Sequence, residues 1–247
     1  AGETSHKVTV GIYNINTQQT IYLDTGDNTN QYYCGITWNP NNKFIYLYNL
    51  NRQQNHLKLL EFDILTGKKT RQIYEETSSK YINIRRGLTF LPWDGNSFLF
   101  SSEKDGYDHL YLFNLQTSEI TKITDDKFGV VLSIAGFNSS TKSVIINCTG
   151  QFELQHNLYI ISLENSSFSL LGNQKGCHNA SLSVDGSFLL DTWSAFDVPQ
   201  QIDLINTINN EIVTLHQSPN PYEGYNLPEI TVVKLESNDE NKTPLYY

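Results

Sequence analysis

The chain repeats one hairpin pattern five times, and this repeat constrains the fold more than any other feature of the sequence. In each copy a β-prone residue and a short polar residue precede a turn rich in Asn, Thr or Gly and then another β-prone stretch, which is typical of a hairpin. The copies begin at Tyr13, Phe62, Phe113, Ile161 and Ile205, between 44 and 51 residues apart. A regular period of this length indicates a repeat architecture.

Two more strand candidates precede four of these hairpins, so the repeating unit has four strands. The candidates are joined by the turns NPNN, WDGN, NSST and VDGS, whose residues tolerate tight-turn dihedral angles. Four antiparallel strands in about 45–50 residues match one blade of a β-propeller. We therefore predict an all-β propeller portion over residues 1–217, with a half blade at 8–23 and four complete blades at about 31–76, 81–124, 130–171 and 177–216. An irregular β-sandwich with accidental spacing is the alternative.

Composition and charge agree with this fold and exclude several partners. The chain is 12% aromatic, and aromatic residues favour strands. Its net charge of −9 disfavours nucleic acid and anionic membrane as partners, since both require a basic patch. No apolar run approaches the roughly 18 residues that a membrane helix needs. The three cysteines, Cys34, Cys148 and Cys177, form no CxxC and cannot all pair, so we predict ordinary packing for them.

The repeat pattern ends at Gln217. Residues 218–247 read as a connector bearing Pro, Asn and Gly, followed by the start of an alternating strand pair. A half blade at one end and an interrupted hairpin at the other predict that the chain is a portion of a larger propeller. Blades taken from a larger ring expose their outer packing faces, and we expect Ile36, Trp38, Leu189 and Leu190 to lie on those faces.

Two segments carry a family resemblance. Residues 94–113, DGNSFLFSSEKDGYDHLYLF, contain a strand and then the pattern Ser-Glu-x-Asp-Gly-Tyr-x-His-Leu-Tyr, and residues 50–68 contain Asn-Arg-x-Gln-Asn before a strand. The first pattern is filled by Ser102, Glu103, Asp105, Gly106, Tyr107, His109, Leu110 and Tyr111. Over residues 8–247 the chain resembles the propeller of the dipeptidyl peptidase IV group in the prolyl oligopeptidase family. The resemblance implies an eight-bladed ring, with residues 218–247 leading toward an α/β-hydrolase domain.

The resemblance also implies a function for the parent protein. That parent is similar to a serine exopeptidase that removes N-terminal dipeptides after Pro or Ala, and whose propeller limits substrate entry and shapes the substrate pocket. The family's nucleophile lies in Gly-x-Ser-x-Gly, with Asp and His following. This pattern does not occur in the sequence, and none of the six histidines has a triad context. We therefore expect this chain to be catalytically silent by itself.

Further expectations concern partners and location, and one alternative function stays open. The resemblance implies a peptide substrate bound together with the hydrolase domain, a homodimeric parent, and a periplasmic or extracellular location. We expect no cofactor and no metal. The alternative is a stand-alone propeller module for protein–protein binding. A Gly-x-Ser-x-Gly domain following Tyr247 in the full gene would discriminate between the two.

One residue of the sequence is a candidate for substrate binding. Mammalian members of the family place an Arg just before the first strand of this blade, where it reaches the carbonyl of the second substrate residue. Counting back from DGNSF puts Arg85 at that position, with Arg86 beside it. The alternative is that this arginine pair only solvates a loop.

Two acidic groups are tempting candidates that we do not assign. The family binds the substrate's amino terminus with two Glu, since two carboxylates hold an ammonium group, but that pair lies earlier, on a helical insertion. Glu75 and Glu76 are also neighbours on a strand, so they point to opposite faces. Glu103, Asp105, Asp108 and His109 lack the spacing of metal ligands, and we interpret them as a structural blade signature.

Overall fold

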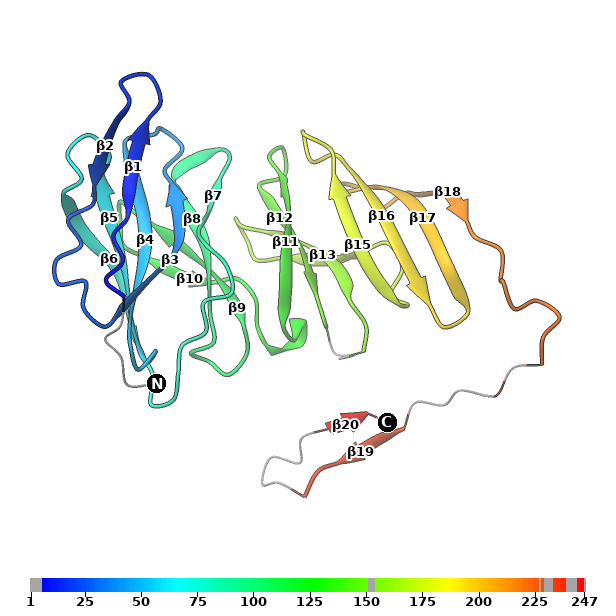
Figure 1. The fold of residues 1–247 in the computed structure, drawn as a ribbon. Coiled ribbons are helices and arrows are strands. Elements are labelled where there is room, and N and C mark those ends of the chain that lie inside the picture. The colour runs from blue at the N-terminus through cyan, green and yellow to red at the C-terminus, as the bar shows by residue number, and fades with distance from the viewer. Residues whose placement is uncertain (1–5, 151–153, 227, 229–232, 239–243, 247) are drawn as a thin grey trace.

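The structure is a computed structural model that describes residues 6–150, 154–226, 228, 233–238 and 244–246. Within these residues the chain is built from β-strands, with one short 3₁₀ turn, η1, at Asp126–Phe128. Figure 1 shows the strands gathered into successive sheets that follow one another along the chain. This arrangement sets each sheet beside the next one in the sequence.

Four of the sheets have four antiparallel strands each, in sequential order. The first contains β3 (Gln31–Trp38), β4 (Phe44–Asn51), β5 (His56–Asp63) and β6 (Lys69–Thr77). The second contains β7 (Thr89–Leu91), β8 (Asp94–Ser102), β9 (His109–Asn114) and β10 (Ile120–Lys122). The third contains β11 (Val131–Asn138), β12 (Ser143–Cys148), β13 (Asn157–Ser162) and β14 (Phe168–Leu171). The fourth contains β15 (Cys177–Leu182), β16 (Phe188–Ala195), β17 (Val198–Asn206) and β18 (Ile212–Gln217).

Two smaller sheets flank this series. The strands β1 (Gly11–Asn14) and β2 (Gln19–Tyr22) form a two-stranded sheet before the first blade. The strands β19 (Lys234–Glu236) and β20 (Pro244–Tyr246) form another after the last blade, and much of the segment around them lies outside the described residues. In the part of the chain described, no helix has the length and apolar character needed to cross a membrane.

The repeated polar residue of each hairpin shapes the turn that follows it. The Asn14 side chain accepts hydrogen bonds from the backbone N–H groups of Asn16 and Thr17, and Gln18 N donates to the Asn14 carbonyl. Gln18 itself has a φ of 57°, in the left-handed region. The same backbone bond and a positive φ recur at Gly67, Ser118, Ser166 and Asn210. The sequence repeat is therefore a repeat of one turn geometry.

The hydrophobic core lies between consecutive sheets, and each central strand contributes to two layers. Phe98 and Phe100 of β8 pack toward the first blade, and the ring of Phe98 stacks on that of Phe113 with 5.2 Å between centroids. Leu99, which lies between them in sequence, packs instead against the third blade. Both faces of a blade are thus buried against neighbours. This confirms the predicted fold class, a portion of a β-propeller.

The two outermost blades leave apolar faces open. Ile36, Trp38 and Leu190 are 50%, 46% and 39% exposed, as expected. The expectation for Leu189 was wrong, because this residue is fully buried between the last two blades. Successive strand residues point to opposite faces, so only Leu190 of this pair lies on the open side.

The cysteines occupy three different environments, and none is in a disulfide. Cys148 is fully buried and Cys177 is exposed. Burial raises the pKa of the Cys148 thiol to about 11 and also raises that of the half-buried Cys34. The thiolate is the reactive form of cysteine. At mildly alkaline pH, Cys34 and Cys148 therefore react more slowly than a thiol whose pKa is not raised.

We therefore expect one fast-reacting thiol in the native chain at pH 8. A disulfide reagent that releases a coloured thiolate should modify Cys177 first, Cys34 more slowly, and Cys148 only after denaturant is added. Cys177→Ser should remove the fast phase and leave the others unchanged. Equal rates for the three thiols in the native chain would contradict the burial described for Cys148.

Candidate functional site

Two connections meet at one end of the second blade and form its candidate site. Residues 78–88 join β6 to β7, and residues 103–108 join β8 to β9. Neighbouring strands of the blade are antiparallel, so both connections emerge at the same end of the sheet. The side chains that meet there are Asn83, Arg85, Arg86, Glu103 and Asp108, which we call the Arg85 site.

The two neighbouring arginines of the Arg85 site lie in different environments. The Arg85 side chain is 44% exposed, and its Nε donates to Glu103 Oε1 at 3.0 Å. The Arg86 side chain is only 16% exposed, and its Nη2 donates to Asp108 Oδ2 at 2.8 Å and to the Val131 carbonyl at 2.6 Å. Arg86 therefore ties the two connections of its own blade to the first strand of the next. Arg85 is the arginine that faces solvent.

The buried ion pair at this site is held against a strong desolvation penalty. Asp108 is 2% exposed, and burial raises the pKa of its carboxyl even though the Arg86 guanidinium opposes the shift. Burial likewise lowers the pKa of Arg86, although the Asp108 charge acts in the other direction. For both groups, the loss of hydration outweighs the attraction. Asp108 is also 3.8 Å from Arg85 Nε, so its charge helps to hold both arginines.

The blade signature noted in the sequence contains four acidic or histidine side chains, Glu103, Asp105, Asp108 and His109. In the structure they do not converge on one point. Asp105 accepts from Tyr111 Oη at 2.7 Å and pairs with Lys122 at 3.1 Å, whereas His109 Nε2 lies 3.1 Å from Asp126 Oδ1. Glu103 and Asp108 pair with the arginines. Among the described residues, no three His, Cys, Asp or Glu side chains are arranged to hold a metal ion.

Glu75 and Glu76 are separated by the alternation of β6. Glu75 contacts His56 and accepts from Gln72 Nε2 at 2.8 Å, on the exposed side of the strand. Glu76 accepts from Tyr74 Oη and Ser102 Oγ, each at 2.8 Å, and thereby links the first blade to the second. The two carboxylates therefore have separate partners.

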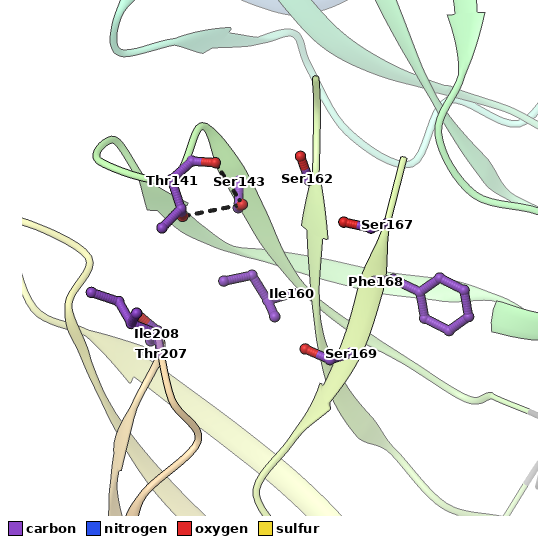
Figure 2. A pocket seen from close by; sticks show the side chains of 9 residues that line it. All are labelled: Thr141, Ser143, Ile160, Ser162, Ser167, Phe168, Ser169, Thr207 and Ile208. Atoms are coloured by element: carbon purple, nitrogen blue, oxygen red, sulfur yellow. Dashed lines mark hydrogen bonds between the residues drawn. The ribbon is translucent and has the colours of Figure 1, made fainter. Parts of the chain in front are cut away.

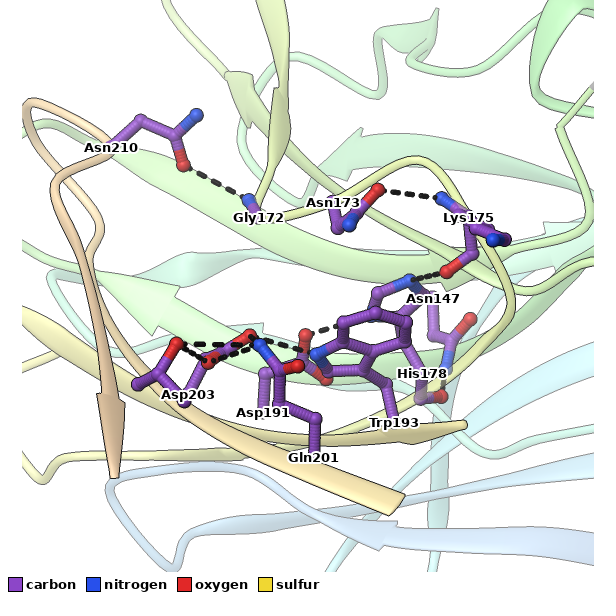
Figure 3. A network of polar contacts seen from close by, with 11 residues as sticks. Asn147, Gly172, Asn173, Lys175, His178, Asp191, Trp193, Gln201, Asp203 and Asn210 are labelled. Carbon is purple, nitrogen blue, oxygen red and sulfur yellow. Dashed lines mark hydrogen bonds and ion pairs between the residues drawn. The ribbon is translucent and has the colours of Figure 1, made fainter. Parts of the chain in front are cut away.

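The last blade contains a buried His–Asp pair that the sequence analysis did not find (Figure 3). His178 Nδ1 lies 2.7 Å from Asp191 Oδ2, and the His178 ring stacks on Trp193. His178 Nε2 lies 3.1 Å from the Lys175 carbonyl, which can only accept a hydrogen bond. The nitrogen that would activate a nucleophile is therefore occupied by the backbone. The pair joins strands and is not part of a triad.

A pocket lies at the other end of the sheets, between the third and fourth blades (Figure 2). Its volume is about 360 Å³. Hydroxyl side chains dominate its wall, which contains Thr141, Ser143, Ser162, Ser167, Ser169 and Thr207 together with Ile160, Phe168 and Ile208. Among the residues that the structure describes, no histidine or carboxylate lines the pocket, so none of them could act as a base that activates one of these hydroxyl groups as a nucleophile. The pocket is separate from the Arg85 site.

Comparisons with known proteins agree with this architecture. The family described as the dipeptidyl peptidase IV (DPP IV) N-terminal region matches residues 1–200. The crystal structure of a putative dipeptidyl aminopeptidase IV from Bacteroides ovatus is 33% identical, with a TM-score of 0.90, and the match covers 100% of this chain and 37% of that one. Dipeptidyl peptidase 4 from Porphyromonas gingivalis shares the fold at 20% identity, with a TM-score of 0.82 and coverage of 100% and 35%.

The class follows from the blades themselves: the chain is a β-propeller segment in which the second and third blades bury both faces against their neighbours. It belongs to the family of dipeptidyl peptidase IV N-terminal regions. The chain spans little more than a third of the solved relatives that it matches. The predicted substrate contact of Arg85 stays a prediction.

Proposed function

We propose that the chain is the non-catalytic propeller portion of a dipeptidyl peptidase IV-like serine exopeptidase that removes N-terminal dipeptides after Pro or Ala. In this proposal the propeller limits access to the active site, and the Arg85 site forms part of the substrate pocket. The catalytic Ser, Asp and His belong to a hydrolase domain of the parent protein. The parent works in the periplasm or outside the cell, as a homodimer.

The exposure and the hydrogen bonds of Arg85 are the observations that support a contact between this residue and the substrate. Its side chain is 44% exposed, and its Nε is held by Glu103. Its two terminal nitrogens make no hydrogen bond to any residue that the structure describes. A fixed, partly exposed guanidinium with unused N–H groups is suited to donate to a peptide carbonyl oxygen. Family membership supports the peptidase assignment.

A stand-alone propeller that binds other proteins is the second candidate. The open apolar faces around Trp38 and Leu190 favour it, because exposed apolar patches mark interaction surfaces. The full-length protein decides between the two candidates. It should hydrolyse a Gly-Pro chromogenic substrate in a reaction blocked by an active-site serine reagent, whereas the chain of residues 1–247 alone should not. A full-length protein with an intact triad and no such activity would overturn the peptidase proposal.

We expect Arg85→Ala in the full-length enzyme to raise KM for the Gly-Pro substrate by about tenfold to a hundredfold, with little change in kcat. The reason is that a hydrogen bond from a charged group is worth about 1.5–3 kcal/mol, and each 1.4 kcal/mol corresponds to about a factor of ten. Steady-state kinetics measure this directly. Lys80→Ala removes another exposed cation of the same connection and should leave KM unchanged. Equal KM values for the Arg85 variant and the wild type would return Arg85 to the solvated-loop alternative.

A further inference from the structure

The Arg85 guanidinium is anchored through one edge only. Glu103 accepts from Nε, the nitrogen nearest the chain, whereas nothing among the described residues hydrogen-bonds to Nη1 or Nη2. An exposed arginine carries about 2 kcal/mol of rotamer entropy. Fixing Nε removes much of that freedom before a ligand arrives, and therefore the ordering cost of binding falls.

Glu103 is itself held in place at the end of a strand. It directly follows β8, and its backbone carbonyl accepts from Gly106 N at 2.9 Å in the β8–β9 turn. Its Oε1 also lies 3.4 Å from Asn83 Nδ2, so the same oxygen contacts two side chains of the connection before β7. The carboxylate is 27% exposed and therefore partly shielded from water. Glu103, at the end of β8, therefore links this strand to the connection that contains Arg85.

We propose that Glu103 is a positioning residue, which holds Arg85 Nε so that the two terminal nitrogens point to a carbonyl oxygen of the bound peptide. This inference rests on the proposed function of the Arg85 site. Glu103 does not touch the substrate in this arrangement. It acts through Arg85, and its effect must disappear when Arg85 is absent. An exposed ion pair without a positioning role contributes little to stability and would not change substrate affinity.

The test is a double-mutant cycle in the full-length enzyme with the Gly-Pro chromogenic substrate. We expect Glu103→Ala to raise KM about threefold to tenfold with kcat nearly unchanged, as a loss of uniform binding does. Glu103→Gln keeps an oxygen that can accept from Nε and should recover most of the affinity. In the Arg85→Ala background, Glu103→Ala should have no further effect. Glu119→Ala, an exposed acid in the turn before β10, is the matched control and should behave as wild type.

Any different outcome of this cycle would overturn either the positioning role of Glu103 or the substrate contact of Arg85. If Arg85→Ala raises KM and Glu103→Ala does not, Glu103 is an ordinary surface ion-pair partner. If Glu103→Ala lowers KM, the carboxylate competes with the substrate for Arg85. An equal effect of Glu103→Ala with and without Arg85 would show that Glu103 acts independently. If Arg85→Ala changes nothing, the substrate contact itself fails, and the positioning role with it. Thermal unfolding of each variant confirms that the kinetic changes occur in folded protein.

Discussion

Replacing Asp108 with alanine is expected to lower the free energy of unfolding of the chain by about 3–5 kcal/mol, the usual cost of removing one partner of a buried ion pair. Asp108 is 2% exposed, and Arg86 lies 2.8 Å away with a side chain that is 16% exposed. Without Asp108, the Arg86 charge stays in a poorly hydrated position, where the Val131 carbonyl is the one acceptor left among the described residues. Urea denaturation followed by tryptophan fluorescence measures the change.

The double variant Arg86→Met/Asp108→Leu should recover most of that loss. Burial shifts the pKa of Asp108 upward and that of Arg86 downward, so desolvation opposes both charges in the folded chain. An apolar pair of similar size avoids this penalty. Asp197→Ala, which removes an exposed acid paired with Lys175, is the control and should leave the unfolding midpoint unchanged. A single Asp108 variant as stable as the Asp197 variant would contradict the buried-pair interpretation.

The blades could be predicted from the sequence because each one is a local structure. Each of the five repeated hairpin turns is specified by a polar residue and the four positions after it, as with Asn14 and Gln18. The partners of the Arg85 site are not local. Arg86 bonds to Asp108 and Val131, which are 22 and 45 residues away and partly in the next blade. The connection 78–88 has no periodic pattern, so the sequence alone could not show that Arg86 is buried and Arg85 exposed.

The alternation of side chains along a strand predicted the arrangement of Glu75 and Glu76 but not that of Leu189 and Leu190. It correctly separated Glu75 from Glu76, because a polar strand such as β6 shows its two faces in the sequence. In the central strands both faces are apolar, and Ser143 to Cys148 of β12 are buried without exception. The open and the covered face of Leu189–Leu190 therefore look alike in the sequence. Only the order of the blades in space distinguishes them.

The open faces of the first and last blades lead to the second large effect, which is self-association of the isolated chain. On the last blade, Leu190, Leu204 and Val213 lie opposite one another across three strands, so their side chains share one face. Leu190 and Val213 are 39% and 52% exposed. On the first blade, Trp38 of β3 is 46% exposed and lies opposite Ile45, on the side against which Val10, Ile12 and Leu23 pack. Both faces are built to pack against another sheet.

We expect the isolated 28.2 kDa chain to associate head to tail, with the first face of one copy against the last face of another. Such contacts between unlike faces are heterologous, so assemblies should grow with concentration. Sedimentation velocity over a concentration series measures this growth. Because each contact needs both faces, Leu190→Lys alone and Trp38→Lys alone should each reduce association, with circular dichroism unchanged. Val184→Lys changes an exposed apolar residue in the β15–β16 turn, away from these faces, and should have no effect. A chain that stays monomeric at every concentration would contradict the expectation, and so would one in which only one of the two face variants acts.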